Sequence, residues 1–351
     1  MSSTAPTVAP FGSWDSPISA QTLVSGATGC NEAIADRSDV WWAESRPDEG
    51  GRTVLVRWRN GAIADMSPAD IDVRTRAHEY GGGAWTVANG LVVFSDDATG
   101  RLFLINTTAS PIAEPLALTP EPALERGWRF ADMQFSPDRR FVLSVREDHH
   151  DETRTEPRNQ IVSVAADGSG SVTVLVDGPD FVSTPRPSPD GQRLAWLQWN
   201  HPAMPWDNTE MGVATLTSAG SQPPTLGPVS VLAGGPPDDA AAEAGGADGV
   251  GLFQPTWTSD GTLIVVSDQS NWGNIIAIPE GGDSSSAIAV TTGEVEIGTP
   301  HWVFGMSRIA VTPTGDVWFS GATPSGDELG LIPAAALASA LEGTQIGRAH
   351  V

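Results

Sequence analysis

The sequence predicts an all-β protein, a β-propeller with six recognisable blades of about four strands each. Two observations carry this prediction: one apolar–turn–apolar pattern occurs six times, and its spacing is nearly constant. A third observation is that only residues 334–342 have the composition and periodicity of a helix. A pattern that repeats at such a period is typical of propellers and related repeat architectures.

Six turns mark the repeat. In each copy a short apolar segment precedes a turn centred on Asp-Gly or its equivalent, and a strongly apolar run follows. Four of the five steps between the turns are close to 50 residues, and the fourth step is longer. The turn residues are Asp36, Asn89, Asp138, Asp190, Asp260 and Thr314, at steps of 53, 49, 52, 70 and 54 residues.

The composition of each unit predicts several strands. Ser188-Pro-Asp-Gly191 is typical of a β-turn, because Pro presets φ and Gly tolerates a positive φ. The run Leu263–Val266 is rich in β-branched residues and fits a strand buried on both faces, as a middle blade strand is. A β-sandwich is the alternative, but its turns have no reason to repeat one motif at this period. Further strands are expected at 101–105, 160–164, 171–177, 211–216 and 274–278.

The repeat divides the chain into a short lead-in and one propeller. We expect a flexible lead-in at 1–20 and the propeller at 21–345. The long fourth step contains residues 218–250, rich in Pro, Ala, Gly and Asp, which we expect to form a flexible insertion. Residues 346–351 match the translation of a short-read sequencing adapter, so we expect a non-native tail there.

Charge and hydropathy limit the classes of partner that the chain is expected to bind. The net charge is −24, and all 19 basic residues are Arg. Binding to nucleic acid or to an anionic membrane needs clustered positive charge, so we expect neither partner. No segment has the length of uninterrupted apolar sequence that a membrane helix needs, and no secretory leader is recognisable, so we expect a cytoplasmic protein. No cofactor and no metal are expected.

Two loops carry the candidate site residues. His78, Glu79 and Tyr80 precede three glycines, which let a backbone approach another group closely. Glu79 is a candidate to bind a substrate amine or a loop of the missing domain; the alternative is that the segment is a crossover between blades whose polar groups satisfy the channel rim. His201, Trp206 and Asp207 lie in a polar-aromatic hairpin that either lines a cavity or caps the propeller.

Other polar and aromatic clusters favour structural interpretations. The run 147–152 resembles a metal cluster in composition, but adjacent histidines on a strand point to opposite faces, so we expect a solvated charged loop. Five tryptophans are placed at strand positions of the repeat, where we expect them to pack between blades. They are Trp85, Trp196, Trp257, Trp302 and Trp318.

Four segments resemble one enzyme family. They are Val73–Trp85, Leu194–Asp207, Phe253–Trp272 and Pro300–Met306. In this order and on this period, they resemble the propeller of the prolyl oligopeptidase family, in its bacterial dipeptidyl-aminopeptidase and acylaminoacyl-peptidase-like branch. The resemblance implies that the propeller gates short peptides to a C-terminal α/β-hydrolase domain, which carries a Gly-x-Ser-x-Gly elbow followed by Asp and His.

The chain departs from that family pattern. No Gly-x-Ser-x-Gly segment occurs in it, and no strand–helix alternation follows residue 320. We therefore expect no catalytic residue, no catalytic domain and no activity in this chain alone, although its parent family consists of hydrolases. Propellers of the family commonly have seven blades, so the six turns predict an incomplete seven-bladed ring.

Two other functions fit a propeller. A stand-alone binding module, similar to the propeller of the Tol–Pal system, would need a closed ring. A metal-dependent lactonase would need an acidic cluster that converges on the central channel, and the sequence shows no clear cluster of that kind.

Overall fold

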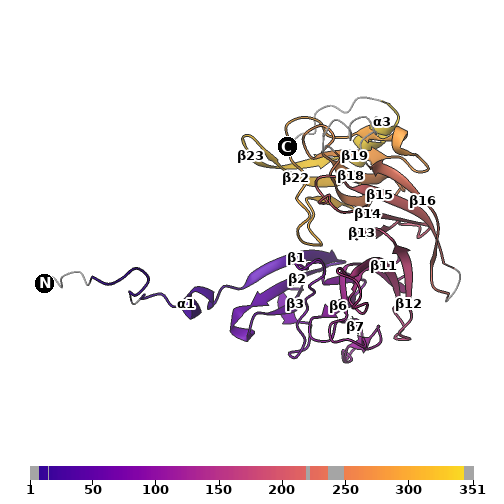
Figure 1. The fold of residues 1–351 in the computed structure, drawn as a ribbon. Helices are drawn as coiled ribbons and strands as arrows, with labels where there is room; N and C mark the ends of the chain where they lie inside the picture. The colour runs from indigo at the N-terminus through magenta and orange to yellow at the C-terminus, as the bar shows by residue number, and fades with distance from the viewer. Residues whose placement is uncertain (1–7, 15, 219–221, 236–248, 344–351) are drawn as a thin grey trace.

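The computed structural model describes residues 8–14, 16–218, 222–235 and 249–343. Six antiparallel sheets follow one another along the chain and are arranged around a common centre (Figure 1). Five sheets have four strands and the sixth has three. The predicted all-β propeller with six blades is confirmed.

Each blade is a meander in which consecutive strands pair. Blade 1 has β1 (Gly29–Asp36), β2 (Asp39–Arg46), β3 (Arg52–Arg59) and β4 (Ala62–Asp65); blade 2 has β5 (Trp85–Ala88), β6 (Leu91–Asp96), β7 (Arg101–Asn106) and β8 (Leu116–Ala117); blade 3 has β9 (Trp128–Phe135), β10 (Phe141–Asp148), β11 (Arg158–Ala165) and β12 (Val172–Asp177). Blade 4 has β13 (Phe181–Pro187), β14 (Arg193–Trp199), β15 (Glu210–Thr217) and β16 (Thr225–Gly234); blade 5 has β17 (Leu252–Trp257), β18 (Leu263–Ser267), β19 (Asn274–Ile278) and β20 (Ile288–Ala289); blade 6 has β21 (Ile309–Val311), β22 (Val317–Thr323) and β23 (Gly326–Ile332).

Helices are few in the described residues. The predicted helix near 334–342 is present as α3 (Ala334–Leu341), whose buried Leu337 packs into the core beside blades 5 and 6. The lead-in contains one short helix, α1 (Ala20–Val24), and single 3₁₀ turns lie at Pro47–Glu49 and Ser284–Ser286. Within the described part of the chain, no helix is long and apolar enough to span a membrane.

The segment 218–250 differs in part from the expected flexible insertion. Its residues Thr225–Gly234 form β16, which pairs with β15 along most of its length. Alternating apolar residues such as Leu226 and Leu232 pack against buried clusters, so this part joins blade 4 as its outer strand. Residues 219–221 and 236–248 of the expected insertion, the first seven residues of the lead-in and the expected tail at 346–351 lie outside the described residues.

The meander gives the propeller two distinct faces. Because strands alternate in direction, the turns between the first and second strands all lie on one face, together with the turns between the third and fourth. The turns between the second and third strands lie on the opposite face, together with the connections from one blade to the next. We call this second face the loop face. It contains both candidate loops, 78–83 and 200–208.

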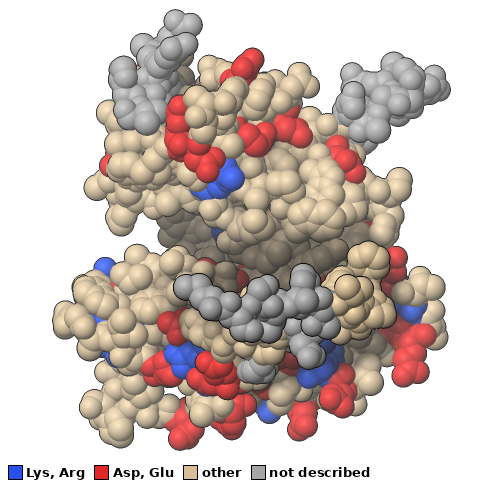
Figure 2. Space-filling view, turned by 90° about the vertical axis from the view of Figure 1, so that its left-hand side faces the viewer, with Lys and Arg blue, Asp and Glu red and all other residues tan. Residues whose placement is uncertain are grey.

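Side-chain packing joins each blade to the next. Five clusters of buried apolar residues lie between blades 1 and 2, 2 and 3, 3 and 4, 4 and 5, and 5 and 6. Among the described residues, no such cluster joins blade 6 to blade 1. Those two blades face each other across the remaining side of the ring, and a space-filling view of that side shows a hollow between them (Figures 1 and 2).

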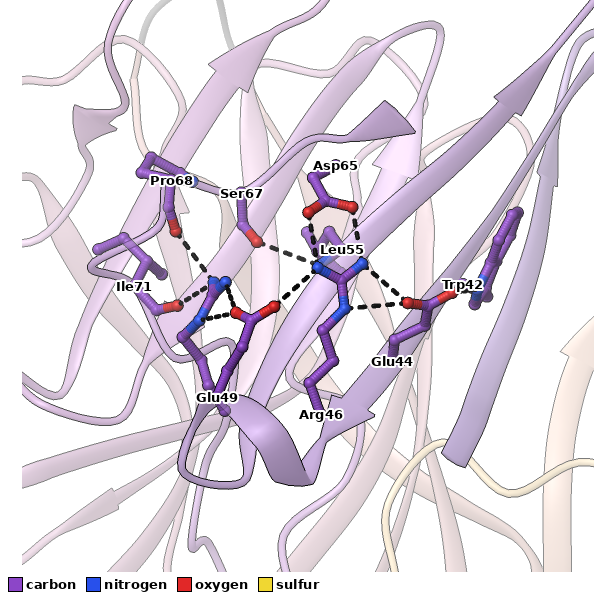
Figure 3. Close-up of polar contacts among 10 residues, drawn as sticks. Trp42, Glu44, Arg46, Glu49, Leu55, Asp65, Ser67, Pro68 and Ile71 are labelled. Atoms are coloured by element: carbon purple, nitrogen blue, oxygen red, sulfur yellow. Dashed lines mark hydrogen bonds and ion pairs between the residues drawn. The ribbon is translucent and has the colours of Figure 1, made fainter. Parts of the chain in front are cut away.

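Polar contacts cover part of the outer face of blade 1. Arg46 forms ion pairs with Glu44 at 2.8 Å, Asp65 at 2.6 Å and Glu49 at 3.2 Å (Figure 3). Arg46 holds the pKa of the Asp65 carboxyl below its usual range, so the network stays charged at neutral pH. Val54, on the face of β3 beside Glu44, is fully buried although no blade packs on that side.

Each end face also carries exposed apolar side chains. On blade 1, Ile63 is 66% exposed and lies beside Trp58. On blade 6, Leu329 is 59% exposed and Trp318 is also exposed, which corrects the expectation that Trp318 packs between blades. Contiguous exposed apolar surface favours association.

We expect the chain to self-associate through these end faces. The double variant Ile63→Asp with Leu329→Asp should shift the weight-average mass toward the monomer in sedimentation velocity, because each Asp would bury a charge on association. Val229→Asp is the matched control, since Val229 is exposed on β16 away from the end faces. A parent chain that is monodisperse and monomeric at high concentration would contradict this.

Candidate functional site

The glycines of the loop at 78–83 permit a very close backbone contact. Gly82 forms a parallel bridge with Phe304, and the Phe304 amide donates to the carbonyl oxygen of Gly81 at 2.9 Å. A Cβ added to Gly82 would lie 2.3 Å from the Phe304 carbonyl oxygen, and one on Gly83 would lie 2.7 Å from the Asp132 amide. Both glycines have positive φ, so a side chain would be excluded by space and by backbone conformation alike.

This contact joins distant parts of the ring. The loop at 78–83 connects blades 1 and 2, whereas Phe304 belongs to the connection between blades 5 and 6. The two segments meet on the loop face, where Phe304 is buried. His301, in the same connection, is half-buried, and desolvation lowers its pKa to about 4, so its imidazole is neutral at physiological pH.

His78 is half-buried, and its polar groups are bound by neighbouring residues of the propeller. Its Nε2 is 3.0 Å from Oδ1 of Asn159, and its backbone amide donates to the Glu147 carboxylate at 2.6 Å. Its ring lies 4.6 Å from that of Phe304 and makes an edge contact with Trp199. Burial, the largest cause, lowers the pKa of His78, which favours a neutral ring that positions the loop.

Glu79 and Tyr80 face outward. Glu79 accepts a hydrogen bond from Arg129 at 2.8 Å, and this guanidinium holds the pKa of the Glu79 carboxyl below its usual range. Glu79 is therefore anionic and already has a partner. Tyr80 is 63% exposed and makes an edge contact with Trp302 at 5.3 Å between ring centroids.

The two candidate loops meet through Trp302. The ring centroid of Trp302 lies 4.7 Å from that of Trp206 and 5.3 Å from that of Tyr80. We call Tyr80, Trp206 and Trp302, with the exposed Met204 and Met306, the aromatic patch. Trp302 is 46% exposed and lies in a loop, so the expectation that it packs between blades is wrong.

The other candidates of the second loop stabilise their surroundings. His201 Nε2 is 2.8 Å from the Glu156 carboxylate, which raises the pKa of His201 and links the loops of blades 3 and 4. The Asp207 carboxylate accepts from the Met204 amide at 2.9 Å and closes the turn that presents Trp206. Asp207 therefore acts within its own loop.

Charged residues of the run 147–152 form contacts within the propeller. Glu147 is buried, accepts the amide of His78, and is 3.1 Å from Nε2 of His149. His150 Nδ1 lies 2.7 Å from Asp148. The two histidines thus pair with different carboxylates, and Glu147 is part of the core rather than of a solvated loop.

A ring of bulges lines the central channel. In blades 1, 3, 4 and 5 the innermost strand has a bulge at which one residue takes a positive φ: Glu32, Asp132, Thr184 and Gln254. The bulge residues of blades 1, 3 and 5 each accept a hydrogen bond from a backbone amide in, or just before, the first strand of the next blade. Glu32 accepts from the Gly83 amide at 2.8 Å, Asp132 from Thr184 at 2.8 Å, and Gln254 from Arg308.

A cavity lies beside this ring. It has a volume of about 780 Å³ and lies between β1 and the segment 303–310, where it is lined by Glu32, Tyr80 and Trp85 among others. Its lining combines aromatic rings, carboxylate and backbone. This arrangement suits binding of an extended polar-apolar ligand.

Several of these residues were not predicted from the sequence to belong to the site. The bulge residues differ chemically, but Asp132, Thr184 and Gln254 each precede their turn marker by six positions, as do the backbone donors Gly83 and Arg308, whereas Glu32 precedes its marker by four. That register was readable from the repeat. The exposure of Trp302 could not be predicted in this way, because a single sequence does not show whether a tryptophan packs between strands or lies exposed in a loop.

Comparisons with known proteins were made for the whole chain. No family model matches it, and no curated protein does. Among solved structures, a Mycobacterium tuberculosis puromycin-hydrolysing peptidase is 32% identical with a TM-score of 0.78, over 95% of this chain and 49% of that chain. A puromycin hydrolase is also 32% identical, with a TM-score of 0.79, over 94% of this chain and 49% of that chain.

More distant structures share the fold alone. A prolyl endopeptidase is 12% identical with a TM-score of 0.56, over 87% of this chain and 41% of that chain.

The fold and the 32% identical structures define the class of this protein as a peptidase-associated β-propeller. The chain belongs to the prolyl oligopeptidase family and corresponds to the propeller portion, spanning about half the length of these relatives.

Replacing Gly82 tests the close contact. Gly82→Ala should lower the thermal midpoint, with a loss of stability of about 2 kcal/mol or more from overpacking added to the backbone strain. Gly61→Ala is the matched control, because Gly61 also has a positive φ but its added Cβ would meet nothing within 4 Å. Equal losses for the two variants would show that the Phe304 contact contributes nothing.

Replacing Glu32 tests the channel. Desolvation, the largest cause, raises the pKa of Glu32, against the opposing effect of the Gly83 amide. The folded state therefore binds this proton more tightly than the unfolded chain, and its stability falls as pH rises from the ordinary Glu pKa through the raised value.

Glu32→Gln keeps an acceptor for Gly83 and should raise the thermal midpoint at pH 7 but hardly at pH 4. Glu328→Gln, on exposed β23, removes the same net charge and serves as the control. A Glu32→Gln variant less stable than the parent at pH 7 would refute the assignment.

Proposed function

We propose that this chain is the substrate-gating propeller of a prolyl oligopeptidase-like serine peptidase. In this proposal it acts with an α/β-hydrolase domain that supplies the nucleophile, and peptides are the substrates. The observation that carries the proposal is the 32% identity to puromycin-hydrolysing peptidases over nearly all of this chain but only half of theirs. The prediction of a cytoplasmic protein stays a prediction.

The loop face is the surface we assign to the hydrolase domain. Each four-stranded blade ends on this face, so a domain that follows a complete last blade would begin there. The aromatic patch lies on the same face and offers exposed Tyr80 and Trp302, residue types that are enriched in protein interfaces. The chain has no recognisable nucleophile elbow, and it exposes an aromatic surface. Both features fit a chain that acts together with a partner domain.

Gating is supported by the contact at Gly82. Because the loop at 78–83 meets Phe304, polypeptide backbone occupies the loop-face side of the ring beside the channel. In our proposal this contact excludes folded proteins, and short peptides approach beside it through the central channel. A seventh blade, followed by the hydrolase domain, would complete the enclosure in the parent protein.

A chimera tests the proposal. Residues 20–343 would be joined to the half of the M. tuberculosis puromycin-hydrolysing peptidase that this chain does not cover. We expect the chimera to hydrolyse puromycin and short peptides but not folded casein-sized proteins, whereas the present chain alone hydrolyses none of them. Trp302→Ala in the chimera should reduce hydrolysis, because the aromatic patch would lose its contact with the hydrolase domain.

The controls separate folding from function. The exposed Trp14, in the lead-in, is replaced by Ala for comparison with Trp302. Circular dichroism and a cooperative melt establish that each chimera is folded. A folded chimera without hydrolysis, or hydrolysis by the present chain alone, would overturn the proposal.

A further inference from the structure

An unusual concentration of arginines lies on the loop face between blades 2 and 3. A pocket there is lined by Arg74, Arg76, Arg126 and Arg129, with Asp96 and Asp97 as its carboxylates. The chain has 19 basic residues against 43 acidic ones, so four arginines around one pocket run against its overall charge. We call this the arginine pocket.

Two arginines of the pocket share one of its carboxylates. Asp97 pairs with Arg76 at 3.2 Å and with Arg126 at 3.4 Å, so a single carboxylate is shared between two guanidiniums. Asp96 is buried and accepts from the amide and hydroxyl of Thr99. Each guanidinium has five N–H donors, so both half-exposed arginines keep donors for a ligand.

Arg74 is the member best placed to bind. It is exposed and forms no ion pair with any residue in the described ranges. Arg74 and Thr75 line both the arginine pocket and the cavity of about 780 Å³ beside Tyr80. An anionic group held at Arg74 would therefore leave the remainder of the same ligand in that cavity.

The floor of the pocket is preorganised. Arg126 takes a left-handed conformation, with φ of 52°, and its Nε donates to the Asp97 carbonyl at 2.9 Å. Gly100 lies so close to Trp128 that an added Cβ would be 2.5 Å from its carbonyl oxygen. Arg129 is held from behind by Glu79 at 2.8 Å and by the buried Glu147 at 3.5 Å. Little reorganisation is needed to receive an anion.

We propose that the arginine pocket binds a carboxylate of the peptide substrate. This inference rests on the proposed function for the identity of its ligand as a peptide. Planar guanidiniums match carboxylates in charge and geometry, and such hydrogen bonds are the stronger, charge-assisted kind. The carboxylate is either the C-terminus of a short peptide or an acidic side chain. The pocket thus selects for anionic peptides within a protein whose surface otherwise repels them.

Calorimetric titration of the present chain with matched tripeptides tests this proposal. Ala-Ala-Ala is compared with Ala-Ala-Ala-amide, and Ala-Glu-Ala-amide with Ala-Gln-Ala-amide. We expect the anionic member of at least one pair to bind about tenfold more tightly or better, and the difference to shrink with added salt. Which pair shows the difference identifies the C-terminus or the side chain as the source.

Arginine variants locate the effect. Arg74→Gln and Arg126→Gln should each remove most of the preference for the anionic peptide. Arg139→Gln is the matched control, because Arg139 is exposed on the opposite face and also has a positive φ. The preference should survive in this control.

Three results would overturn the proposal: equal binding within both pairs, no peptide binding at all, or an equal loss in Arg139→Gln. The chimera reports on the proposed function separately. A chimera that hydrolyses puromycin while the tripeptides show no charge preference would reject the pocket alone. An inactive chimera with a preserved preference would reject the peptidase role alone.

Discussion

The backbone contact between Gly82 and Phe304 determines how this ring is held together. Elsewhere neighbouring blades adhere through buried apolar clusters, but the described residues provide none between blades 6 and 1. The parallel bridge near the axis joins the connection after blade 1 to the connection before blade 6. The orientation of His78, the exposure of Tyr80 and the position of Trp302 all depend on where these two segments meet.

Much of the architecture was readable from the sequence because it repeats. The six turn markers predicted six sheets, and the glycines at 81–83 predicted a close backbone approach. The partner of those glycines could not be predicted, because Phe304 lies more than 200 positions away and no repeat relates the two segments. The outer strand β16 was missed because its Gly and Pro content resembles a loop, while its pairing with β15 depends on tertiary context.

The two candidate loops were chosen from the sequence, but the contacts of their side chains were not predicted. Both loops lie on the loop face as a consequence of meander topology, and Tyr80 and Trp206 meet through Trp302. His78 and Asp207 proved to be positioning residues, since a single sequence does not reveal which polar groups are satisfied internally. The result is a surface with adjoining aromatic, cavity and guanidinium regions. In our proposal these regions recognise a partner domain and a short peptide, and the partner domain carries out the chemistry.

The genomic DNA downstream of codon 345 tests the central claim most directly. If this chain is the propeller portion of a serine peptidase, the frame should continue through another blade-like repeat of about 50 residues. A Gly-x-Ser-x-Gly segment after a buried strand should follow, and then Asp and His in that order. A stop codon at that point, or a continuation without a nucleophile elbow, would contradict the account.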